Sequence, residues 1–152
     1  MKLSQIFIGS FDNFKVFNKL DTQQASLTNF NSPNSVWQIV NHLIIWQEYQ
    51  IDKLCKLETK DINEIDTWII EKDVSNQEML NEKIELFEKQ IVKIKLELSK
   101  LSLEQTDIEQ KLKIIQDLTI HLSFHLGEII LILRQNGHYP MPNEMKSFLS
   151  FE

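Results

Sequence analysis

The chain has 152 residues, which suits one domain, and residues 1–152 are interpreted as a single domain. Only three glycines and three prolines interrupt it, which disfavours β-sandwiches and small β-barrels because those folds need a turn every ~8–12 residues. The net charge of −6, with lysines interleaved among acidic residues, argues against nucleic-acid and membrane-surface partners. A lone cysteine, Cys55, and the lack of an apolar run near ~20 residues predict a cytoplasmic protein.

The first of four predicted helices covers roughly Lys2 to Leu20. Its apolar residues recur at the spacing of one helical face, namely Leu3, Phe7, Phe11 and Phe14. Gly9 lies inside this pattern and weakens the prediction by about 1 kcal/mol relative to alanine. Residues 21–34 are polar and include Pro33, so that a loop is predicted there.

The second predicted helix begins at Ser35 and ends near Lys56. Ser35 and Gln38 form the S-x-x-Q pattern of a capping box, in which each side chain accepts a hydrogen bond from an otherwise unpaired backbone N–H. The connection that follows, residues 57–74, is too long for a tight helical hairpin. It predicts a long crossover between the second and third helices.

The third predicted helix opens with another capping box, Ser75 with Glu78. Its apolar residues alternate at spacings of four and three, namely Leu80, Ile84, Phe87, Ile91, Ile94, Leu98 and Leu101. Such a seam is typical of the core stripe of an antiparallel bundle or of a coiled-coil dimer. The bundle is favoured because three other helices also have apolar faces to bury.

The fourth predicted helix runs from Thr106, capped with Glu109, to about Asn136. Gly137 suits the left-handed position that often follows a helix end, and two prolines shortly afterwards prevent the helix from resuming. The four patterns together predict an all-α protein, a four-helix bundle.

Histidines supply the most informative chemistry in the sequence. His121 and His125 are four residues apart, so both imidazoles project from one face of the fourth helix, a geometry that suits one metal ion. Asp117 and Glu128 fall within about 40° of His121 on the same face. The rest of this helix is strongly apolar, and buried polar groups without partners cost several kcal/mol. These four polar residues, Asp117, His121, His125 and Glu128, therefore need a binding partner. A single divalent cation is the simplest partner that would satisfy them together.

His42 on the second helix supplies a third imidazole. Its face carries Ile39, Ile45 and Trp46, so that it is expected to point inward. A lone buried histidine is more often an ordinary core residue, and the prediction depends on the combination with the pair on the fourth helix. Three nitrogen ligands with an open position are typical of a catalytic metal site. His138 lies beyond the helix end and is excluded.

Asp117 and Glu128 are the candidate catalytic residues, and the sequence leaves their roles open. Either carboxylate can accept a hydrogen bond from a ligating imidazole and orient it. Either can instead act as a general base toward water activated by the metal. The structural alternative is a salt bridge with a lysine on another helix.

Two segments resemble the DinB-like superfamily. SVWQIVNHLIIWQEYQIDKL is similar to the second helix of that family, where a histidine lies among apolar residues and a tryptophan follows. HLSFHLGEIILILRQNGHYP is similar to the closing motif, in which two histidines with three residues between them precede a glycine, an acidic or amide residue, an arginine and a G-x-x-P ending. Gly127, Glu128, Arg134, Gly137 and Pro140 stand at those positions.

The resemblance implies an up-down-down-up four-helix bundle and a homodimer. It also implies a metal, zinc or nickel, held by His42, His121 and His125. Relatives include thiol transferases, a thiol-dependent isomerase and metal-dependent hydrolases without an assigned substrate. Arg134 is the only arginine and is expected to face away from His121, so that no basic cluster is present to grip a thiol cofactor.

The leading hypothesis is a metal-dependent enzyme that activates water or a low-molecular-weight thiol, as a hydrolase or a thiol S-transferase acting on a small molecule. The alternative is a non-catalytic, stress-related protein in which a dimeric helical bundle serves interaction alone. This alternative rests on the second and fourth helices, which are apolar over most of their circumference. Self-association is the simplest way to cover such faces.

Overall fold

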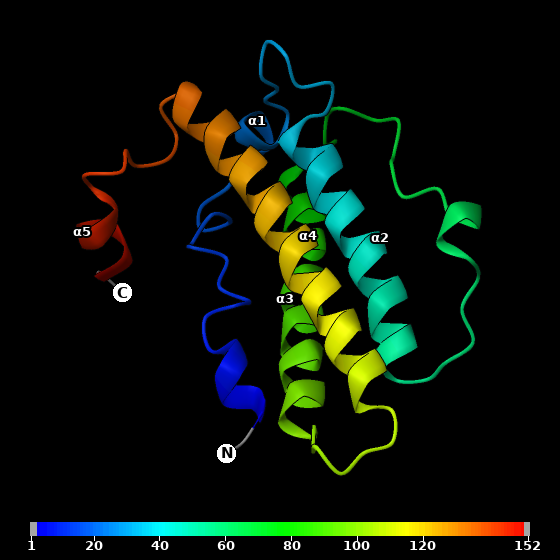
Figure 1. The fold of residues 1–152 in the computed structure, drawn as a ribbon. Coiled ribbons are helices and arrows are strands. Elements are labelled where there is room, and N and C mark those ends of the chain that lie inside the picture. The colour runs from blue at the N-terminus through cyan, green and yellow to red at the C-terminus, as the bar shows by residue number, and fades with distance from the viewer. Residues whose placement is uncertain (1–2, 151–152) are drawn as a thin grey trace.

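The structure is a computed structural model that describes residues 3–150. Those residues form helices and loops without any β-strand, which confirms the all-α class (Figure 1). The elements in chain order are the 3-10 helix η1 (Leu3–Phe7), α1 (Thr22–Ala25), α2 (Val36–Leu54), the 3-10 helix η2 (Ile62–Glu64), α3 (Gln77–Ser99), α4 (Ile108–Gln135) and α5 (Met145–Ser150).

Three long helices make up the body of the fold. Helix α2 packs against both α3 and α4, and the facing side chains form one apolar core. Figure 1 shows that α2 and α3 run in the same direction and that α4 returns in the opposite one. Residues 55–76 carry the chain back to the end where α2 began, as expected of a crossover, and include only the short turn η2.

The N-terminal segment differs from its prediction. The predicted start, Lys2, lies outside the described residues, and the helix expected to reach Leu20 ends at Phe7. Several residues beyond it have positive φ, namely Gly9, Phe14, Lys15 and Lys19. The left-handed conformation costs roughly 1–2 kcal/mol for a residue with a side chain and cannot continue a right-handed helix. Residues 8–20 are therefore a series of turns, and three long helices are seen where four were predicted.

The same segment nevertheless contributes to the core. Phe11, Val16, Phe17 and Leu20 are buried, and the Phe17 ring meets the Phe87 ring of α3 edge to face, with 4.9 Å between centroids. Phe14, which the helical spacing placed on the same face as Phe11, is exposed instead. Of the predicted apolar face, Leu3 and Phe11 are buried and Phe7 is partly buried, whereas Val16, Phe17 and Leu20 are core residues that the predicted face did not include.

Helix starts agree with the sequence to within two residues. Ser35 caps α2 in the predicted capping box, accepting from the Gln38 backbone N–H while the Gln38 side chain accepts from that of Ser35. Helix α3 is capped by Asn76 and not by Ser75. Helix α4 follows Asp107 and not Thr106, and Asp107 forms ion pairs with two lysines instead of a side-chain cap.

The apolar seam of α3 is covered by the chain itself. Leu80, Phe87, Ile91, Ile94 and Leu98 are buried, and Ile84 and Leu101 are partly buried against the same core. Both α2 and the N-terminal segment lie against α3. The seam is therefore a core stripe within one chain, as the bundle interpretation expected.

Helix α4 is the one described helix that is long and apolar enough, by length and composition alone, to cross a membrane. A core helix of a soluble protein passes the same test. Its inner face is part of the apolar core, where Ile115, Ile129 and Ile132 are almost fully buried. Gly137 follows its end with a φ of 76°, which agrees with the predicted helix stop.

Candidate metal centre

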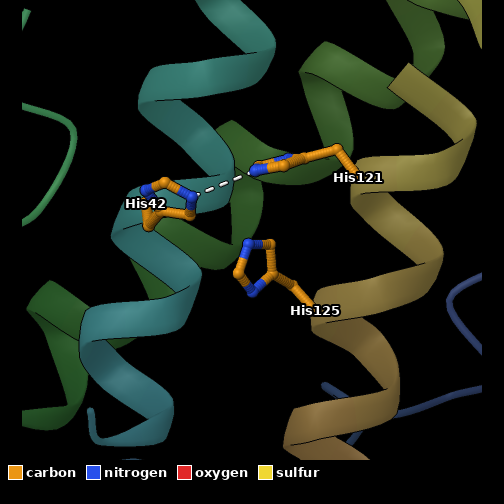
Figure 2. A group of neighbouring side chains, drawn as sticks. All are labelled: His42, His121 and His125. Carbon is orange, nitrogen blue, oxygen red and sulfur yellow. Dashed lines mark hydrogen bonds between the residues drawn. The ribbon is translucent and has the colours of Figure 1, made fainter. Parts of the chain in front are cut away.

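The three histidines selected from the sequence meet in space. His42 extends from α2, and His121 and His125 extend from consecutive turns of α4 toward it (Figure 2). One ring nitrogen from each lies within 4.8 Å of the others. His42 and His125 are only 7% and 6% exposed, and His121 is partly buried. The chain thus holds a largely buried group of imidazoles that could bind one metal ion.

The tautomer of His42 follows from its backbone partner. Its Nδ1 lies 3.1 Å from the carbonyl oxygen of Thr67, and a carbonyl only accepts hydrogen bonds, so Nδ1 must carry the proton. In the neutral ring, Nε2 then has a free lone pair. That Nε2 lies 3.0 Å from Nε2 of His121 and points toward the centre of the group (Figure 2).

His125 is oriented in the same way by a carboxylate. Its Nδ1 donates to Oε2 of Glu128 over 2.5 Å, from the next turn of the same helix. This pairing also leaves Nε2 for ligation. A carboxylate bonded to the outer nitrogen is the usual arrangement around metal-binding histidines, where it fixes the ring and makes the ligating nitrogen more basic.

His121 differs because its outer nitrogen lacks a partner. Nδ1 is buried and makes no hydrogen bond within the described structure. Burial, followed by the positive charges that His125 and His42 would carry, lowers the pKa of His121 to about 3. Burial also lowers the pKa of His42, against the opposing effect of its bond to Thr67. Both rings are therefore neutral near pH 7, which is the form that binds metals.

Aromatic side chains cover the histidine rings on three sides. Trp68 stacks on His42 with 3.9 Å between ring centroids, and Trp46 stacks on His121 at 4.1 Å. Phe124 meets His125 edge to face at 5.0 Å. These rings shield the imidazoles from part of the solvent and so strengthen the electrostatic interactions among them, because the local dielectric constant falls.

Two of these partners, Thr67 and Trp68, lie in the crossover and were missed by the sequence analysis. The crossover is held along α2 by side chains on the face that carries His42. Oγ of Ser35 donates to the Lys72 carbonyl at 2.6 Å, and Nε2 of Gln38 donates to the Ile69 carbonyl at 2.9 Å. Nothing in residues 57–74 has a period or motif that would have indicated this role.

The remaining polar residues lie as follows. Asp117 pairs with Lys113 of its own helix at 2.5 Å and not with a lysine of another helix, and it forms no hydrogen bond to an imidazole of the group. Nε of Arg134 donates to the Pro140 carbonyl, away from the histidines. His138 is exposed and near Gln24, apart from the group.

A metal ion fits the donor set. Imidazoles bound to one tetrahedral ion at ~2.0–2.1 Å place their nitrogens roughly 3.3–3.4 Å apart. Here Nε2 of His42 and Nε2 of His121 are 3.0 Å apart, and the ligand nitrogens of all three rings lie within 4.8 Å of one another. Because Nε2 of His42 is unprotonated, Nε2 of His121 donates the hydrogen bond between the two rings when no ion is bound. The His121 proton would have to move to the buried, unpartnered Nδ1 for this ring to bind a cation.

Comparison with known proteins does not assign the chain to a family. No family model matches the chain, and no match is found among curated proteins or among solved structures. Sequence and structure therefore describe an all-helical protein with a three-histidine group that could hold a metal ion.

Proposed function

We propose that His42, His121 and His125 bind a divalent metal ion, zinc or nickel, and that the protein is a metal-dependent enzyme. One observation carries the proposal, namely the approach of three imidazole nitrogens to within 4.8 Å inside a helical core. Imidazole groups brought this close without a shared ion repel one another whenever they are protonated. A shared cation bound by the lone pairs of the neutral rings would instead stabilise this arrangement.

The chemistry follows from a site with three nitrogen ligands. A divalent ion held there lowers the pKa of water or of a thiol and so provides a nucleophile near neutral pH. Glu128 holds the proton of His125 at Nδ1, and the Thr67 carbonyl does the same for His42. Asp117, beside His121 at the surface, is proposed as the general base once it leaves Lys113. The reaction is hydrolysis of a small molecule or transfer of a low-molecular-weight thiol.

We further propose that the chain is a divergent member of the DinB-like superfamily. The ligand set that this resemblance implies meets in space, and the long crossover leaves α2 and α3 parallel. The N-terminal segment takes the place of the first helix of an up-down-down-up bundle, since it runs opposite to α2 and packs on α3. Its turns distinguish this chain from a regular four-helix bundle.

Elemental analysis of protein purified without an affinity tag or chelator tests the metal. We expect about one ion per chain in the wild type, a loss of that ion in His121→Ala, and its retention in His138→Ala, whose ring is exposed elsewhere. Circular dichroism checks that both variants fold. Folded wild-type protein that binds no zinc or nickel when dialysed against either would contradict the proposal.

The thiol version has its own test. The metal-loaded protein is incubated with several low-molecular-weight thiols and 1-chloro-2,4-dinitrobenzene, whose product is followed by absorbance. Turnover that disappears in His121→Ala supports a thiol transferase. No turnover with any thiol would remove that version and leave the hydrolase.

The second candidate function is a homodimeric interaction protein without catalysis. The observation that favours it is the set of exposed apolar side chains on the long helices, including Val92, Leu96 and Leu131. Such side chains on two helices suit self-association. Sedimentation at micromolar concentration should show a dimer, and a monomer at that concentration would contradict this second function. A folded dimer without bound metal would favour this second function over the enzyme.

A further inference from the structure

A hollow of about 310 Å³ opens at the surface beside the histidine group. It is lined by Trp46 of α2 and by Asp117, Ile120, His121 and Phe124 of α4. It reaches the group directly, because His121 forms part of its wall and the Phe124 ring touches that of His125. A molecule lying in the hollow would therefore be next to the proposed metal site.

The wall of this hollow is mainly apolar and open to solvent. Ile120 and Phe124 are 60% and 64% exposed and lie one turn apart on α4, so that two large apolar side chains are left open to solvent together. No described residue of the chain stacks on their outer sides. Covering such surface contributes about 25 cal/mol per Å², so an apolar ligand would gain affinity here.

The lining of the hollow provides no cationic side chain to bind an anionic ligand. Asp117 is the only charged lining residue, and its carboxylate is paired with Lys113. The one arginine, Arg134, is bonded to the Pro140 carbonyl. A ligand with carboxylates or phosphates in the hollow would find no guanidinium to pair with, whereas an uncharged aromatic group would meet rings and aliphatic side chains.

We infer that the hollow binds the apolar, aromatic part of a small-molecule substrate, whose polar end faces the three histidines. Phe124 and Ile120 are then the residues that determine specificity. This inference rests on the proposed metal function and adds the substrate class, which that function leaves open. It favours aromatic electrophiles or esters over highly polar, sugar-bearing substrates.

Two hydroxamates with the same metal-binding group test the inference. Cobalt(II) replaces the natural ion, and its visible absorption bands report the titration of benzohydroxamate or acetohydroxamate into the protein. We expect benzohydroxamate to bind at least tenfold more tightly. The preference should fall several-fold in Phe124→Ala and in Ile120→Ala, because each removes apolar wall without removing a histidine.

Leu131→Ala is the matched control, since Leu131 is 51% exposed on the same helix but does not line the hollow. It should keep the wild-type preference. Equal affinities in the wild type, or a preference that survives in both wall variants, would overturn the inference alone. Absence of cobalt bands would overturn the proposed metal function and the inference with it. A dimer that dissociates in Phe124→Ala, with no hydroxamate preference, would assign the hollow to a second copy instead.

Discussion

The outer nitrogens of the three imidazoles have different surroundings. His42 donates to a backbone carbonyl, His125 donates to a carboxylate, and the outer nitrogen of His121 has no partner. A carboxylate is the strongest of these acceptors, because a hydrogen bond to an ionised group is shorter and about twice as strong as a neutral one. Glu128 should therefore contribute most to the orientation of a ligand.

Glu128→Gln is expected to weaken metal binding by roughly 10–100-fold, the range typical of lost partners behind ligating histidines. The amide keeps the size of the side chain and removes its charge. Zinc affinity measured by competition with a chromophoric chelator checks this. Glu109→Gln, on an exposed turn of the same helix, is the control and should bind zinc as the wild type does. Equal affinities for both variants would refute a role for Glu128.

Acid should destabilise the metal-free protein through His121. Its pKa is about 3 in the folded chain and near 6.5 when unfolded, so the unfolded chain binds more protons between these values. The corresponding stability is fully present above about pH 6.5 and is lost progressively as the pH falls toward 3. The urea midpoint of chelator-treated protein should fall between pH 7 and 5, and fall less in His121→Gln. Parallel decreases would contradict this explanation.

Helix termini show how local sequence and neighbouring structure share control of an element. Ser35 caps α2 as its pattern predicts, and its hydroxyl also binds the crossover at Lys72. The observed cap of α3, Asn76, directly follows the predicted one, Ser75. Both residue types are good caps, so the choice depends on where the crossover ends.

Asn76→Ala should therefore cost about 1 kcal/mol of unfolding free energy, because its side chain accepts from the Met79 N–H at 2.9 Å. Ser75→Ala should change stability by less than about 0.5 kcal/mol, as expected of an exposed position away from a cap. Urea denaturation of both variants measures the difference. If Ser75→Ala lost more unfolding free energy than Asn76→Ala, Ser75 and not Asn76 would be the cap, as the sequence predicts.

At the scale of the whole molecule, the N-terminal segment completes the core without forming the predicted helix. Its buried side chains lie against α3, and the Phe17 ring contacts that of Phe87. Tyr139, beyond the end of α4, donates to the Phe14 carbonyl and packs against Phe148 of α5. The N-terminal segment and the segment that follows α4 thus contact each other at Phe14 and Lys15.

Phe17→Ala should destabilise the protein by roughly 3–5 kcal/mol, the usual cost of removing a buried phenylalanine. Phe30→Ala should change stability by at most about 0.5 kcal/mol, because that ring is fully exposed. Chemical denaturation provides both values. A small effect of Phe17→Ala would mean that the segment contributes little to the core.

Periodicity by itself determined the three long helices and the face that carries His121 and His125, because both depend on contacts three or four residues apart. The same signal failed for residues 8–20, because spacing assigns residues to one face only if the backbone is helical, and the turns there bury Phe11 but expose Phe14. Only the tertiary structure brought His42 to His121 across 79 positions and supplied Thr67 and Trp68 from a loop without a pattern. Such contacts depend on how helices pack and where a crossover lies, which no local stretch of sequence encodes.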